Sequence, residues 1–76
     1  MAIAMYSTPS CSYCRMAKQY FKENRIPFRE FDVSRDERRA EEMYKKSGQM
    51  GVPVIDVNGQ ILVGFDKARL ERALKR

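Results

Sequence analysis

The chain has 76 residues, of which 43% are hydrophobic and 33% are charged, and its formal net charge is +5. This length fits one domain with one small core, spanning residues 1–76, and the composition is that of a folded globular protein rather than a disordered one. The 15 basic residues are interspersed with 10 acidic ones and form no basic and aromatic array. We therefore expect no nucleic-acid partner. We also expect a monomer.

Residues 1–6 form an apolar opening with no basic residue in front of it. This run is too short for the apolar part of a secretory signal or for a membrane span, so we expect a cytoplasmic protein without a membrane segment. A continuous apolar run is also typical of a strand that is covered on both faces. We predict such a central strand over residues 2–6.

A helix is predicted after the break at residues 7–10, because the spacing of apolar residues then becomes helical. The helix starts at Cys11 and runs to about Asn24, and Pro27 prevents its continuation. Its apolar face carries Cys14, Ala17, Tyr20 and Phe21. Residues 28–33 alternate only roughly between apolar and polar, which predicts a short, half-exposed strand near an edge of the sheet.

A second helix is predicted to open at Ser34, because Ser34 and Glu37 have the spacing of a capping box. Gly48 is a natural end for this helix, since glycine readily adopts the left-handed conformation of a helix terminus. One face of the helix would carry Ala40, Met43, Tyr44 and Ser47.

The last part of the chain reads as a hairpin followed by a helix. Asn58-Gly59 separates two apolar runs, residues 54–57 and 61–63, and this dipeptide suits a tight turn in which both residues have positive φ. Asp66 is a plausible N-cap for a final helix with the inner stripe Leu70, Ala73 and Leu74. The resulting order is strand, helix, strand, helix, strand, strand, helix. This is an α/β fold whose first two strands are parallel.

Both cysteines of the chain, Cys11 and Cys14, lie where the first helix begins. Their spacing brings the two sulfur atoms to one side of the first helical turn, close enough to bridge. The exposed amides and the positive end of the helix dipole favour a thiolate on Cys11, while Cys14 lies deeper on the apolar face. This asymmetry predicts thiol–disulfide exchange in which Cys11 attacks and Cys14 resolves the mixed intermediate.

Metal binding is the alternative use of a Cys-x-x-Cys pair. A closed tetrahedral zinc site needs four ligands, and the chain has no further cysteine and no histidine. Zinc would therefore need carboxylate ligands or a second copy of the chain, and an iron–sulfur cluster would have to be shared between two chains. We favour redox exchange and expect no metal and no bound cofactor.

Three motifs of this chain resemble those of the glutaredoxins, and the resemblance covers nearly the whole length. Cys11-Ser12-Tyr13-Cys14 is similar to the family's Cys-Pro-Tyr-Cys, Val52-Pro53 is similar to its Thr-Val-Pro, and residues 63–66 are similar to its Gly-Gly-aromatic-Asp. The resemblance implies a small thioredoxin-type fold, with a four-stranded mixed sheet and helices on both faces.

The resemblance also implies a function and a set of site residues. The chain would be a thiol–disulfide oxidoreductase that acts on disulfide-containing proteins or small thiols, with Cys11 as nucleophile and Cys14 as resolving thiol. Pro53 would be cis and lie opposite the thiols. The substrate-binding residues implied in this way are Tyr13, Gln49, Val52, Pro53, Gly64, Phe65 and Asp66.

The electron donor is the point on which the sequence departs from the family pattern. Glutaredoxins that use glutathione usually have a basic residue where this chain has Thr8, another where it has Met50, and a second glycine where it has Val63. Glutathione stays a candidate reductant through the backbone of Val52 and the helix start at Asp66. The alternative is a redoxin linked to ribonucleotide reductase, which takes its electrons from thioredoxin reductase.

Overall fold

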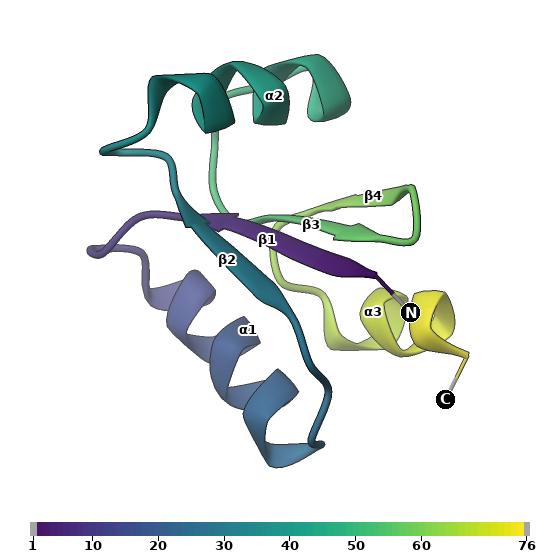
Figure 1. Cartoon of the computed structure of the whole chain (residues 1–76). Coiled ribbons are helices and arrows are strands. Elements are labelled where there is room, and N and C mark those ends of the chain that lie inside the picture. Colours follow the sequence, from purple (N-terminus) through teal and green to yellow (C-terminus); the bar gives the residue numbers. More distant parts are fainter. Residues whose placement is uncertain (1, 76) are drawn as a thin grey trace.

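Four strands form one mixed sheet in the order β2-β1-β3-β4 in the computed structural model, which describes residues 2–75 (Figure 1). β1 pairs in parallel with β2 and antiparallel with β3, and β3 pairs antiparallel with β4. The elements in chain order are β1 (Ile3–Ser7), α1 (Ser12–Glu23), β2 (Arg29–Asp32), α2 (Glu37–Ser47), β3 (Val54–Val57), β4 (Gln60–Val63) and α3 (Lys67–Leu74).

The three helices cover the two faces of this sheet unequally. Figure 1 shows α2 on one face and both α1 and α3 on the other. The larger part of the core lies between the sheet and the α1 and α3 side chains Ala17, Tyr20, Phe21, Leu70 and Leu74. A smaller cluster under α2 contains Tyr6, Met43 and Val54. The apolar first strand is therefore central and covered on both faces, as predicted.

The predicted order of elements and the predicted parallel pairing are confirmed, and so is the hairpin turn. Asn58 has φ +52° and Gly59 has φ +93°, which are the positive values that a tight turn of this type needs. β2 lies at an edge of the sheet, where the weak alternation of its residues placed it. No helix in residues 2–75 has the length and apolar character needed to cross a membrane.

The beginning of α2 differs from the prediction. Its N-cap is Asp36, whose side chain accepts a hydrogen bond from the Arg39 backbone N–H at 3.1 Å. Ser34 lies before the helix, where its backbone N–H and hydroxyl both donate to Asp32 Oδ1. The capping-box prediction was wrong because Asp36, an equally good cap, is nearer to the helical run.

A smaller difference concerns one face of α2. Tyr44, predicted to share a face with Met43, is 52% exposed, whereas Met43 is fully buried. The predicted end of α1 is confirmed: Asn24 is its C-cap, and Arg25 follows in a left-handed conformation with φ +54°, before Pro27.

A polar network fastens α2 to the sheet. The buried hydroxyl of Tyr6 on β1 donates to Glu42 and accepts from Lys46 Nζ at 2.9 Å. Lys46 also pairs with Asp56 on β3 at 2.7 Å, and Arg39 donates to Glu42 at 3.1 Å. Burial and the hydrogen bond to Glu42 raise the pKa of Tyr6, and the Tyr6 hydrogen bond is the largest cause that lowers the pKa of Glu42.

Candidate active site

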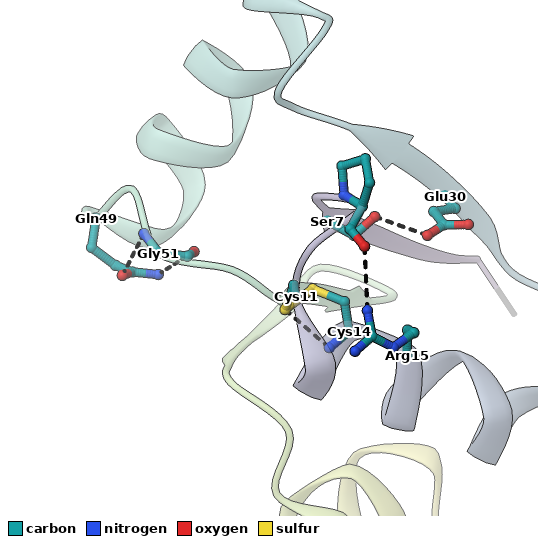
Figure 2. The surroundings of a disulfide bond; sticks show 8 residues. Ser7, Cys11, Cys14, Arg15, Glu30, Gln49 and Gly51 are labelled. Carbon is teal, nitrogen blue, oxygen red and sulfur yellow. Dashed lines mark hydrogen bonds between the residues drawn. A yellow bond between two sulfur atoms is a disulfide. The ribbon is translucent and has the colours of Figure 1, made fainter.

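The two cysteines form a disulfide at the N-terminus of α1, with their Cα atoms 5.2 Å apart (Figure 2). Cys11 is the N-cap residue, and its Sγ accepts a hydrogen bond from the backbone N–H of Cys14 at 3.0 Å. Cys11 is half-buried, whereas Cys14 is only 2% exposed. Cys11 is therefore the more exposed of the two residues, and its sulfur accepts a backbone N–H of the helix, while Cys14 is enclosed by the fold.

The loop between β1 and α1, which leads to Cys11, is held by contacts that involve β1, β2 and α1. Ser7, the last residue of β1, donates from its hydroxyl to Glu30 of β2 at 2.8 Å, and Lys18 of α1 pairs with the same carboxylate at 3.1 Å. Arg15, labelled in Figure 2, donates from Nη1 to the Pro9 carbonyl oxygen at 3.3 Å. The guanidinium of Arg15 is therefore engaged by the loop.

The peptide bond between Val52 and Pro53 is cis, as the family resemblance implied. Pro53 is fully buried, and its carbonyl oxygen accepts a hydrogen bond from the Gly64 backbone N–H at 2.8 Å. Gly64 has φ +82°, a conformation that glycine adopts without steric cost. This bond ties the chain before β3 to the chain after β4.

Charged side chains are absent from the three segments that carry the cysteines and the predicted substrate-binding residues before Asp66. Residues 7–14, 47–55 and 60–65 contain no Asp, Glu, Lys or Arg, although a third of the whole chain is charged. Three of the large apolar side chains exposed on these segments are Tyr13 (59%), Met50 (59%) and Val63 (45%). The segments therefore offer apolar contacts and backbone groups rather than ion pairs.

The structure thus combines a disulfide at a helix N-terminus, a buried strand before it and a cis-proline before β3. The family model for glutaredoxin matches residues 3–62. The chain belongs to the glutaredoxin family. Proteins of this family are thiol–disulfide oxidoreductases that act on disulfides with glutathione or a reductase, so this glutaredoxin is a thiol–disulfide oxidoreductase.

Relatives and solved structures support the same assignment. The chain is 42% identical over 74 residues to an uncharacterized glutaredoxin-like 8.6 kDa protein in the rubredoxin operon of Clostridium pasteurianum, covering 97% of this chain and 99% of that one. It is 31% identical over 64 residues to glutaredoxin 3 of Escherichia coli K12, covering 84% and 77%. A T8A mutant of the thioredoxin-like protein BC3987 superposes with a TM-score of 0.91 at 26% identity, covering 96% and 94%.

The residues that the sequence assigned to substrate binding occupy different positions relative to the disulfide of this glutaredoxin. Tyr13 lies between the cysteines and is exposed, and Val52 is half-buried beside Pro53. Phe65 is half-buried, with its ring centroid 6.2 Å from that of Tyr20 on α1. Asp66 caps α3 by accepting the Arg69 backbone N–H at 3.2 Å.

Gln49 is the assigned residue whose surroundings differ most from the expectation. Its side-chain amide bonds to the backbone of Gly51 at both ends, and in Figure 2 it points to Gly51 rather than to the disulfide. Sequence reasoning missed this pairing, as it missed the contacts of Ser7 and Arg15. The one available signal was the glycine at position 51, immediately before Val52-Pro53.

Metal ligands do not gather around the thiols in the described part of the chain. Among residues 2–75, no group of three or more His, Cys, Asp or Glu side chains is arranged to hold a metal ion. The two sulfur atoms are instead bonded to each other.

Proposed function

We propose that this glutaredoxin reduces disulfides of proteins or small molecules by a two-cysteine mechanism in which Cys11 is the nucleophile. The observation that supports this assignment is the asymmetry of the pair. Cys11 is the more exposed residue, its Sγ accepts the Cys14 backbone N–H, and a thiolate at this position is stabilised by that hydrogen bond and by the helix dipole. Cys14 is enclosed, so it meets only a sulfur that is already attached to Cys11.

The exchange has two steps. The Cys11 thiolate attacks one sulfur of the substrate disulfide, a new S–S bond forms, and the other substrate sulfur leaves as a thiolate that takes up a proton. Cys14 then loses its proton and attacks Cys11 Sγ, which releases the second substrate thiol. Two electrons have moved to the substrate, and the protein is left with the Cys11–Cys14 disulfide of this structure.

A reciprocal pair of variants tests these roles. Cys14→Ser should accumulate a mixed disulfide between Cys11 and the substrate, detectable by mass spectrometry without reducing agent. Cys11→Ser should abolish exchange and trap nothing. Equal trapping by both variants, or a Cys11 thiol that titrates near the free-cysteine pKa of about 8.5, would refute the assignment of the nucleophile.

The electron donor is the second part of the proposal, and we favour thioredoxin reductase over glutathione. Glutathione carries two carboxylates, and residues 7–14, 47–55 and 60–65 hold no cation to pair with them. Arg15, the next residue after Cys14, already donates to the Pro9 carbonyl oxygen. The two positions that are usually basic in glutathione-using relatives hold Thr8 and Met50. An extended protein segment can pair with the Val52 backbone as a strand pairs with its neighbour, and it needs no ion pair to do so.

Turnover with two donor systems tests this choice. The probe is a peptide with an intramolecular disulfide and no charged side chain, reduced in the presence of NADPH and either thioredoxin reductase or glutathione with its reductase. We expect faster turnover with thioredoxin reductase. Faster turnover with glutathione would overturn the donor proposal and leave the two-cysteine mechanism intact.

We also propose that the protein works in a reducing compartment such as the cytoplasm. Its only two cysteines form an exchangeable pair rather than a structural staple, which is the pattern of compartments that keep thiols reduced. Subcellular fractionation that recovered the protein in an oxidising compartment would contradict this.

A further inference from the structure

The loop between α2 and the cis-proline is closed by its own side chains. Gly51 N–H donates to Gln49 Oε1 at 2.9 Å, and Gln49 Nε2 donates to the Gly51 carbonyl oxygen at 3.1 Å. The two bonds form a ring that we call the Gln49 clamp, drawn in Figure 2. Both ends of the amide are therefore used within the loop.

Ser47 supports the clamp from the last turn of α2. Its hydroxyl accepts the Gln49 backbone N–H at 3.3 Å and lies 2.7 Å from the Met43 carbonyl oxygen and 3.0 Å from that of Gln49. The loop is thus anchored to the helix before it is closed on itself. Because residues 48 and 51 are glycines, fixing this loop in one shape costs much conformational entropy. The hydrogen bonds offset part of that cost.

Gly51 fits the clamp because it has no side chain. A Cβ at this position would lie 2.7 Å from Gln49 Oε1, and the three nearest heavy atoms to it all belong to the Gln49 side chain. An alanine at position 51 would therefore displace the Gln49 amide. The two residues depend on each other, and Gly51 leads directly into Val52-Pro53.

We propose that Gln49 is a positioning residue, which holds the backbone of Val52 in place for the substrate through the Gln49 clamp instead of contacting the substrate itself. This proposal rests on the proposed function, because it concerns the backbone of Val52 that would pair with the substrate. It predicts that losing the clamp weakens binding of every disulfide substrate by the same factor, since the Val52 backbone is common to all of them.

A double-mutant cycle tests the proposal. Gln49→Ala and Gly51→Ala are each expected to raise KM about tenfold, in keeping with the loss of one or two neutral hydrogen bonds, and to leave kcat nearly unchanged. The rise should be equal for a glutathionylated peptide and for an uncharged disulfide peptide. In the double variant, Gly51→Ala should raise KM hardly further than Gln49→Ala alone, because the Gln49 amide that it would displace is already absent. Gln60→Ala, an exposed glutamine beside the hairpin turn, is the matched control.

Amide hydrogen exchange supplies a readout that needs no turnover. The Gly51 N–H should exchange faster in Gln49→Ala than in the wild type, whether or not the chain reduces the chosen substrates. A failed activity assay would count against the proposed function, and unchanged exchange at Gly51 would count against the clamp. A rise in KM confined to the glutathionylated peptide would show that Gln49 contacts the substrate directly, and it would overturn the proposal. A rise in KM from Gly51→Ala that is equally large with and without Gln49 would overturn it as well.

Discussion

Removing one buried oxygen atom with Tyr6→Phe should destabilise the protein by about 2 kcal/mol. The hydroxyl is buried, donates to Glu42 and accepts from Lys46, so two hydrogen bonds to charged partners are lost together. A hydrogen bond to a charged group contributes about 1.5–3 kcal/mol to stability. The ring itself would stay packed against Phe31, whose centroid is 5.5 Å away.

The expected loss of stability is smaller than the sum of two such hydrogen bonds, because neither charge becomes unpaired. Glu42 retains its bond from Arg39 at 3.1 Å, and Lys46 retains Asp56 at 2.7 Å. In a domain of this size, about 2 kcal/mol corresponds to a fall in Tm of roughly 10 °C.

Urea unfolding at pH 7, followed by far-UV circular dichroism, measures this difference as a shift of the midpoint at constant m-value. Tyr44→Phe is the control, because Tyr44 also lies on α2 but is 52% exposed. This substitution should lower the free energy of unfolding by no more than about 0.5 kcal/mol. Equal losses for the two variants would refute the assignment of the network.

The pH dependence gives a second check with a defined sign. The hydrogen bond from Tyr6 is the largest cause that lowers the pKa of Glu42 in the folded protein. Its contribution is therefore complete above the ordinary pKa of a glutamate and is lost as the pH falls through the lowered pKa of Glu42. The difference between wild type and Tyr6→Phe should shrink in acid, and a difference that stayed constant would contradict the reasoning.

Three further predictions concern single positions. Asp66→Ala removes the N-cap of α3 and should cost about 1 kcal/mol in urea unfolding, whereas Asp66→Asn, which can still cap, should restore most of it. If the Asp66 carboxylate holds the ammonium group of glutathione, Asp66→Asn should raise KM for a glutathionylated peptide and leave that for an uncharged peptide unchanged, and an equal rise for both would contradict this role. Gly48→Ala should cost about 1 kcal/mol, because its φ is +74° and an added Cβ would meet no atom within 4 Å, so a much larger loss would reveal an unrecognised contact.

The sequence predicted the elements whose signals are local. The period change at Cys11, the Asn58-Gly59 turn and the apolar opening strand each depend on neighbouring residues, and each is found in the structure. The thiol pair was predictable for the same reason, since its chemistry follows from two cysteines at a helix start. The cis bond before Pro53 was predictable only from the family resemblance, because proline alone makes it uncommon.

The contacts that sequence reasoning missed join residues whose relation appears only after folding. Tyr6 reaches Glu42 and Lys46 across the gap between a strand and a helix, and no periodicity relates these positions. Gln49 is a different case, because its partner is only two residues away. From sequence alone, its amide could bond either to the loop or to a substrate. The folded backbone before Val52 brings Gly51 within hydrogen-bond distance of the amide, so the loop is the partner.

The position of β1 in the middle of the sheet makes the order of synthesis matter for this protein. Both cysteines leave the ribosome early, but the strand that leads to them is flanked on one side by β3, in the last third of the chain. Until Val54 to Val57 have been made, one edge of β1 has no neighbour. A fragment that ends before β3 would keep both thiols but would lack the strand that pairs with the second edge of β1, and also the Pro53–Gly64 hydrogen bond.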